Sequence, residues 1–289
     1  MHFIFIRKRI VAITLTIAAI ISLAIGMIQV ARSQDGAVEK EGIRVPILMY
    51  HSILKDPERA GKFVVSPDTF KEDMQYLKEH GYEFVFVSDL VAYVHEGKKL
   101  PKKPVVITLD DGYLNNLTYV LPILEELDMK AVFSIVGIYT DRFTEVNDPN
   151  PNYAHFTWDD VKTLVDSKRV EIGNHSYNLH KMGNRSGVMK KRGESVDAYR
   201  EFLMQDLGKL QEKLKEHVGV EPTVFAYPFG FMCEETTPIL KEMGFKAALT
   251  CNEKVNFITS DSELLYHLNR FNRPSGISTE SFMRKIIVK

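Results

Sequence analysis

Two pairs of reactive side chains follow apolar runs in this chain. The carboxylates Asp110 and Asp111 come directly after VVITL at 105–109, and the imidazoles His175 and His180 follow a second apolar run. One carboxylate and two imidazoles form a three-ligand set for a divalent metal that leaves one coordination position open for water or substrate. This arrangement is typical of catalytic sites, and it makes Asp111, His175 and His180 the predicted ligands.

The spacing of the two histidines limits how they can meet. On a helix, side chains five residues apart point about 140° away from each other, and on an extended strand they face opposite sides. His175 and His180 can therefore converge only if the segment HSYNLH curves as a loop. Taken alone, a histidine at a strand end is often structural, and Asp-Gly favours a turn. The combination of the three residues is what indicates a metal site.

Two further clusters follow apolar runs in the same way. His51 comes directly after the run 46–50, and Tyr227-Pro228-Phe229-Gly230 follows the run 224–226. In a (β/α) barrel the carboxyl ends of the strands share one face, where active sites are built. The pattern therefore predicts that all four clusters lie on one face of the protein.

The rest of the chain alternates short apolar runs with amphipathic segments from Val45 onward. This alternation predicts an α/β protein with a parallel sheet, most simply a (β/α) barrel, in one domain spanning 45–289. Ser66 followed by Pro67 is typical of a helix start. Residues 139–156 are expected to form a loop, and residues 264–271 a strand.

The N-terminus differs from the rest of the chain. Arg7-Lys8-Arg9 precedes residues 10–30, which carry no charge and number roughly 20, enough for a helix to span a bilayer. Residues 1–33 are thus a signal-anchor or, with cleavage near Ser33, a signal peptide. Residues 34–44 form a polar tether. The positive flank predicts that the domain lies outside the cytoplasm, either anchored to the cell membrane or secreted.

The overall composition excludes some classes of protein. The chain has 37 basic and 38 acidic residues, and this balance gives no attraction to nucleic acid. We expect a globular monomer. Cys233 and Cys251 either form a disulfide or remain free thiols, and their spacing matches no metal motif.

At these residues the chain resembles the polysaccharide deacetylase family, metal-dependent carbohydrate esterases with a chitooligosaccharide-deacetylase-type domain. TLDDG at 108–112 matches the first family motif, His-Ser-x-x-x-His at 175–180 the second, and AYPFG at 226–230 the third. The resemblance covers about residues 45–289. The five-residue histidine spacing and the opening PILMYHSI are similar to the poly-N-acetylglucosamine deacetylase branch.

The resemblance implies a distorted (β/α) barrel of about seven β/α units and one divalent metal, usually zinc, on Asp111, His175 and His180. It implies that Asp110 is the general base for a water that attacks the N-acetyl carbonyl of an N-acetylglucosamine unit. Acetate would leave an extracellular or cell-wall polysaccharide. The backbone N–H of Phe229 matches the family's oxyanion donor.

Some residues depart from the family pattern. Ala226 stands where the third motif often carries an arginine that orients the base. Leu265-Tyr266-His267 matches the last motif and makes His267 the candidate general acid, although the following Leu268-Asn269-Arg270-Phe271 resembles relatives that lack this acid. His51 and Tyr227 are candidate substrate-binding residues.

Two other functions are compatible with parts of the sequence. A glycosidase would use two carboxylates roughly 5–9.5 Å apart across a sugar bond, which adjacent aspartates rarely provide. It would also leave His175 and His180 without a role. A metal-holding, carbohydrate-binding relative without activity is the other alternative; Asp110 argues against it, and the missing arginine argues for it.

Overall fold

The computed structural model describes residues 42–287 of the chain. The predicted anchor or signal segment at 1–33 and nearly all of the tether lie outside these residues. Among the residues described, no helix has the length and apolar character needed to cross a membrane.

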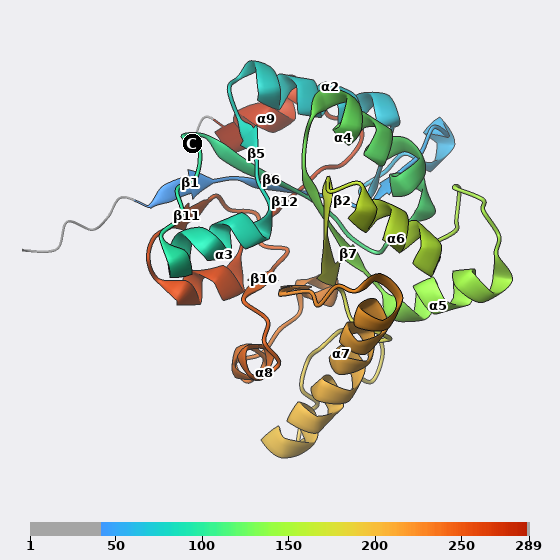
Figure 1. Ribbon diagram of the computed structural model, residues 1–289, viewed down its shortest axis with the longest axis vertical. Helices are drawn as coiled ribbons and strands as arrows, with labels where there is room; N and C mark the ends of the chain where they lie inside the picture. The colour runs from blue at the N-terminus through green and yellow to red at the C-terminus, as the bar shows by residue number, and fades with distance from the viewer. Residues whose placement is uncertain (1–41, 288–289) are drawn as a thin grey trace, which may run out of the picture. The chain divides into compact units, whose positions relative to one another are not determined.

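The elements follow one another largely as alternating strands and helices (Figure 1). The strands are β1 Ile43–Val45, β2 Ile47–Tyr50, β3 Ser52–Ile53, β4 Val64–Val65, β5 Glu83–Phe84, β6 Pro104–Leu109, β7 Ala131–Ile135, β8 Val170–Asn174, β9 Val224–Ala226, β10 Ala247–Leu249, β11 Asn256–Ile258 and β12 Phe271–Asn272. The helices are α2 Pro67–Glu79, α3 Val87–Glu96, α4 Leu121–Leu127, α5 Gly137–Val146, α6 Trp158–Asp166, α7 Val196–Val218, α8 Thr236–Glu242 and α9 Thr279–Ile287. Four short helical segments complete the described part: η1 Pro57–Arg59, η2 Asn116–Val120, η3 Pro228–Gly230 and η4 Ser262–His267.

The central sheet is parallel and barrel-like, as the alternation of runs predicts. Its strands lie in the order β10-β9-β8-β7-β6-β2-β12, with β5 also paired to β6. Leu268 donates its N–H to Ala248 and accepts from Thr250, and β12 pairs with β2 three residues later. The segment 268–272 therefore bridges the two ends of the strand order.

Side-chain alternation along the strands separates two cores. Val105, Ile107 and Leu109 of β6 belong to a cluster with the surrounding helices, whereas Val106 belongs to a second cluster inside the sheet. Successive side chains of a strand face opposite sides, so Thr108 and Asp110 continue the row of Val106. This parity directs Asp110 towards the interior.

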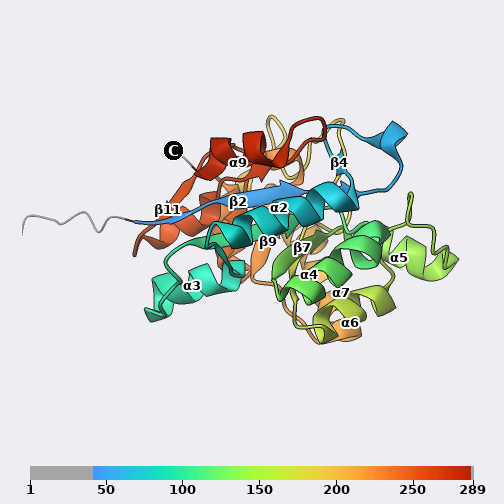
Figure 2. The same ribbon diagram turned by 90° about the horizontal axis from the view of Figure 1, so that it is seen from above.

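The C-terminal helix packs beside the first long helix, α2, of the described part (Figures 1 and 2). Asp73 of α2 is fully buried and accepts hydrogen bonds from Arg273 Nε at 2.7 Å, Tyr50 at 2.9 Å and Thr279 at 2.7 Å. A buried carboxylate needs such partners, because removing it from water is costly. The network fixes the chain just after β12 against the sheet.

The predicted helix start at Ser66 is confirmed. The Ser66 side chain accepts from the Thr69 N–H at the start of α2, and Thr157 and Asp160 form a reciprocal capping box at α6. Two predicted elements are wrong. Residues 139–146 of the expected loop belong to α5, which buries only Gly137 and Thr140 and so has little apolar periodicity. The expected strand at 264–271 is mainly the turn η4, since only Phe271 is in a strand.

Glu171 of β8 is a largely buried carboxylate whose ionisation should lower the stability of the fold. Its carboxylate accepts from the backbone N–H groups of Val87, at 2.9 Å, and Ser88, at 3.3 Å, in the first turn of α3. Burial outweighs these bonds and raises the pKa of Glu171 to about 7. The folded protein therefore binds an extra proton between the unfolded and folded pKa values.

We predict that wild-type stability falls relative to the Glu171→Gln variant as the pH rises from about 4.5 to 8, because ionised Glu171 is disfavoured only in the folded state. The free energies of unfolding should diverge by about 2–3 kcal/mol over this range. Urea titrations at several pH values measure the difference. Glu96→Gln, at an exposed site, is the control. A difference between wild type and Glu171→Gln that does not change with pH would contradict the prediction.

Candidate metal and catalytic site

The four predicted clusters meet at the carboxyl ends of the strands. A cavity of 610 Å³ is lined by Met49, His51, Lys62, Phe63, Asp110, Asp111, Tyr113, His175, His180, Phe229, Cys251, Glu253 and Asn272. The cavity therefore brings together the two aspartates, three of the histidines and Phe229, as the barrel topology predicts.

Asp110 forms a buried, two-pronged ion pair with Arg270. Nη1 and Nη2 of Arg270 each lie 2.8 Å from one carboxylate oxygen of Asp110, and neither residue is more than 2% exposed. Burial would raise the pKa of Asp110, but the Arg270 guanidinium outweighs it and holds that pKa below its ordinary value. Asp110 is thus an ionised carboxylate in a fixed orientation.

Arg270 is the functional residue that the sequence analysis missed. It takes the role expected of an arginine at position 226, but it comes from the segment just before β12. Its Nε donates to the Thr250 carbonyl at 2.8 Å, and Nη1 also contacts the Thr108 hydroxyl at 3.2 Å. The one feature of the sequence that pointed to this segment was the resemblance of 268–271 to relatives that lack the family's usual general acid.

Asp111, His175 and His180 converge on one point. Their candidate ligand atoms all lie within 4.8 Å of one another, and Asp111 Oδ1 is 3.5 Å from His175 Nε2 and 3.2 Å from His180 Nε2. Burial would raise the pKa of Asp111, but the surrounding imidazoles hold it well below its ordinary value. The histidine loop therefore curves as the five-residue spacing requires.

The chemistry of these three residues fits a divalent metal. His175 Nδ1 lies 2.8 Å from the Ala226 carbonyl, which can only accept, so Nδ1 carries the proton and Nε2 presents a lone pair. Asp111 Oδ1 is buried and has no hydrogen-bond partner in the described part of the chain. A divalent cation between these atoms would satisfy the electron pairs that face one another in this buried site.

The loops that carry the site contain strained backbone. Asp111, Ser176 and Phe229 all have positive φ, at 73°, 76° and 60°, a region that non-glycine residues seldom occupy. Asp111 is followed by Gly112 at φ 73°, so the chain turns sharply after Asp110. Such strain is typical of functional sites, and here it directs Asp111 away from the interior row that holds Asp110.

His51 lies in the cavity, whereas His267 does not. His51 follows β2 and contacts the ring of Phe63, with centroids 4.7 Å apart. Its pKa is lowered by burial, which the nearby Asp111 and Asp110 carboxylates partly oppose. His267 is exposed on η4 and is not among the residues that line the cavity. The structure therefore does not bring His267, the candidate acid from the literal match of Leu265-Tyr266-His267, to the cavity.

Tyr227 also differs from the prediction. Its side chain is fully buried, packs edge-on against Phe225 and does not line the cavity. Phe229 does line the cavity, with its ring 4.4 Å from that of His180. Cys233 and Cys251 are free thiols, so of the two open alternatives the disulfide does not form.

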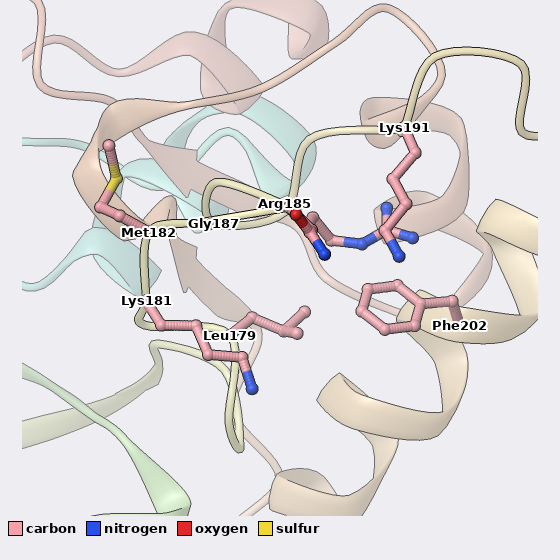
Figure 3. Close-up of a pocket in the computed structure, with 8 residues that line it drawn as sticks. Leu179, Lys181, Met182, Arg185, Gly187, Lys191 and Phe202 are labelled. Carbon is pink, nitrogen blue, oxygen red and sulfur yellow. The ribbon is translucent and has the colours of Figure 1, made fainter.

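The loop after His180 is anchored on two sides. Arg185 stacks on Phe202 of α7 at 3.8 Å and pairs with Glu194, beside a separate 280 Å³ cavity (Figure 3). Gly187 has φ 55°, and a Cβ there would lie 2.8 Å from the Pro228 carbonyl oxygen. The loop therefore packs directly on η3, and this packing fixes the position of His180.

A family model described as polysaccharide deacetylase matches residues 97–248, more than half of the chain. The chain belongs to the polysaccharide deacetylase family. Enzymes of this family are metal-dependent, in agreement with the Asp-His-His cluster.

Individual relatives agree with this assignment. The chain is 28% identical over 222 residues to a poly-beta-1,6-N-acetyl-D-glucosamine N-deacetylase of Escherichia coli (strain K12), covering 70% of this chain and 33% of that protein. A protein of the same name from Staphylococcus aureus (strain N315) is 26% identical over 208 residues, covering 71% of this chain and 66% of that protein. The chain thus spans only a third of the length of the first relative.

Solved structures agree with the fold. A de-N-acetylase from Aggregatibacter actinomycetemcomitans has a TM-score of 0.70 at 23% identity, covering 84% of this chain and 99% of that one. IcaB from Ammonifex degensii has a TM-score of 0.68 at 24% identity, covering 84% of this chain and 96% of that one. These similarities establish a deacetylase-type α/β barrel architecture for the described domain.

We predict that Asp111→Asn and His180→Ala lose the bound divalent metal while the protein remains folded. Each change should weaken metal binding more than about 100-fold, because even residues that only orient ligands cost 10–100-fold. Metal content after equilibrium dialysis measures the effect. The matched control is His95→Ala, since His95 is exposed on α3. Full metal content in both ligand variants would refute the assigned site.

Proposed function

We propose that this protein is a zinc-dependent N-deacetylase that removes acetyl groups from N-acetylglucosamine units of an extracellular or cell-wall polysaccharide. The main support is the juxtaposition of an ionised, arginine-bound Asp110 with the Asp111-His175-His180 cluster in one cavity. The two relatives named poly-β-1,6-N-acetyl-D-glucosamine N-deacetylase favour poly-β-1,6-N-acetylglucosamine as the polymer.

The two adjacent aspartates have separate tasks in this proposal. Asp111, with His175 and His180, would hold the metal, which when bound lowers the pKa of a water and polarises an acetyl carbonyl. Asp110 accepts the proton of the attacking water, because its carboxylate is ionised and lies in the same cavity. Arg270 keeps Asp110 in the orientation that this transfer needs.

His51 is the general acid in this proposal. The departing group is the amine on C2 of the sugar, and it needs a proton as the C–N bond breaks. His51 lines the cavity, and the Asp111 and Asp110 carboxylates favour its protonated form, against the effect of burial on its pKa. The Phe229 N–H is the proposed donor to the developing oxyanion.

Other parts of the proposal rest on the sequence alone. The uncharged stretch after Arg9 favours a domain exported across the membrane, either anchored or released. The expectation of a monomer likewise stays a prediction.

The non-catalytic alternative is weakened by one observation. A carbohydrate-binding relative that only holds metal has no need for an ionised carboxylate beside the metal ligands, yet Asp110 is kept ionised by a fully buried arginine. Such an ion pair is costly to assemble, since both charges leave water. The geometry therefore favours catalysis over binding alone.

The test of the proposal is acetate release by the purified, zinc-loaded protein. Oligomers of β-1,6- and β-1,4-linked N-acetylglucosamine and peptidoglycan should be compared as substrates. We predict that Asp110→Asn keeps the metal but lowers kcat by about 10²–10⁴, the usual contribution of a general base. A metal-loaded wild type without activity on any glycan would favour the binding protein. Loss of metal from Asp110→Asn would overturn the division of roles between the aspartates.

A matched pair of histidine variants identifies the acid. His51→Ala should lower kcat at least 100-fold through loss of the proton donor. His267→Ala should stay within about twofold of wild type, because substitutions at exposed sites rarely affect a distant centre. Steady-state kinetics on the best oligomer separate the two outcomes. The reverse order of effects would restore His267 as the acid.

A further inference from the structure

Two residues that line the catalytic cavity have no part in the reaction described above. Phe63 lies just before β4, and Asn272 ends β12. Both belong to segments that meet beside His51: the Asn272 Nδ2 group donates to the Lys62 carbonyl at 2.8 Å. They form one wall of the cavity.

Asn272 has a buried acceptor in this wall that lacks a partner in the described part of the chain. Its side chain is 91% buried, and its Oδ1 atom has no hydrogen-bond partner among residues 42–287. The amide cannot turn over, because Oδ1 would then face the Lys62 carbonyl oxygen, which only accepts. Buried acceptors without partners are rare in folded proteins and call for a functional explanation. A ligand that donates an N–H or O–H would supply the missing partner.

Phe63 presents an exposed aromatic face at the same wall. Its ring is 46% exposed although it contacts His51, and its backbone carbonyl accepts from the Ser52 N–H at 3.1 Å. The Ser275 N–H further binds the Gly61 carbonyl at 3.0 Å, so the turn that carries Phe63 is fixed at several points. A rigid aromatic ring at a cavity binds apolar faces at little cost in conformational entropy.

We propose that Phe63 and Asn272 recognise the sugar ring whose acetyl group is removed. Phe63 packs against the C–H face of the pyranose, and Asn272 Oδ1 accepts a hydrogen bond from a ring hydroxyl or from the acetamido N–H. This inference deepens the proposed function and rests on its assignment of His51. The nitrogen that His51 protonates is bonded directly to the sugar ring, so the ring must lie beside His51 and its neighbour Phe63.

The residues proposed to bind the sugar are different from those proposed to hydrolyse the acetyl group. Phe63 and Asn272 are not metal ligands and do not contact Asp110, so their loss should weaken binding more than it slows the chemical step. Phe63 also contacts His51, so the change in kcat should be larger for Phe63→Ala than for Asn272→Ala. A group that binds ground state and transition state equally raises KM when it is removed and leaves kcat unchanged.

The first experiment compares Phe63→Ala and Asn272→Ala with wild type on N-acetylglucosamine oligomers. Each change should raise KM roughly tenfold, the effect of losing one hydrogen bond or one packed ring. The kcat should stay within about threefold for Asn272→Ala, which leaves the contact between Phe63 and His51 in place. Phe63→Tyr should restore KM, and bound zinc should be unchanged. Phe257→Ala, which removes a 54% exposed ring on β11, is the control. Unchanged KM in both variants, with wild-type activity intact, would overturn the inference.

A second experiment identifies the hydrogen bond of Asn272. Affinities of the inactive Asp110→Asn protein for deoxy and N-methylated N-acetylglucosamine oligomers are measured with and without Asn272→Ala. An analogue that lacks the donor should lose about tenfold in affinity only when Asn272 is present, which is the signature of direct coupling. If no analogue shows this coupling, Asn272 does not contact the sugar.

These measurements separate this inference from the proposed function. Sugar binding that depends on Phe63 and Asn272, without acetate release by wild type, would support recognition and refute the deacetylase proposal. Acetate release that does not change when either residue is substituted would support the deacetylase proposal and refute sugar recognition by Phe63 and Asn272. Affinity measured by calorimetry requires no turnover, so it remains informative in either case.

Discussion

The buried contact between Asp110 and Arg270 is the constraint on which the rest of the site depends. It removes two charges from water, and such a pair persists only when the geometry and the remaining hydrogen bonds are good. Thr108 and the Thr250 carbonyl provide those bonds for Arg270. The pair links the end of β6 to the segment beside β12, 160 residues away. The packing of this segment on the sheet therefore also determines that Asp110 is ionised.

The two neighbouring carboxylates show how backbone geometry divides chemical roles. Alternation along β6 places Asp110 in the interior row with Val106 and Thr108. Asp111 would continue on the helix-facing side, but its positive φ turns it towards His175 and His180. Like charges on adjacent residues are tolerable here, since one is neutralised by a guanidinium and the other faces imidazoles and the proposed metal. The strained turn after Asp110 lets two adjacent aspartates face different partners.

Much of the site could be predicted from sequence because its signals are local. Strand-end position, histidine spacing and the motif TLDDG all lie within short windows, and together they predicted Asp110, Asp111, His175 and His180, which the structure brings into one cavity. Arg270 could not be predicted in the same way, because its partner is remote in sequence. His267 shows the reverse error: a correct local match lies on a turn that faces solvent. The helix α5 was missed because it buries too few residues to show periodicity.

The position of Arg270 along the chain also has a consequence for the order in which the protein matures. A chain that emerges N-terminus first presents Asp111, His175 and His180 well before the residues that close the sheet. The orientation of Asp110 therefore depends on residues that are synthesised late, in the segment 268–273. Arg273 of that segment is held in turn by Asp73 of α2.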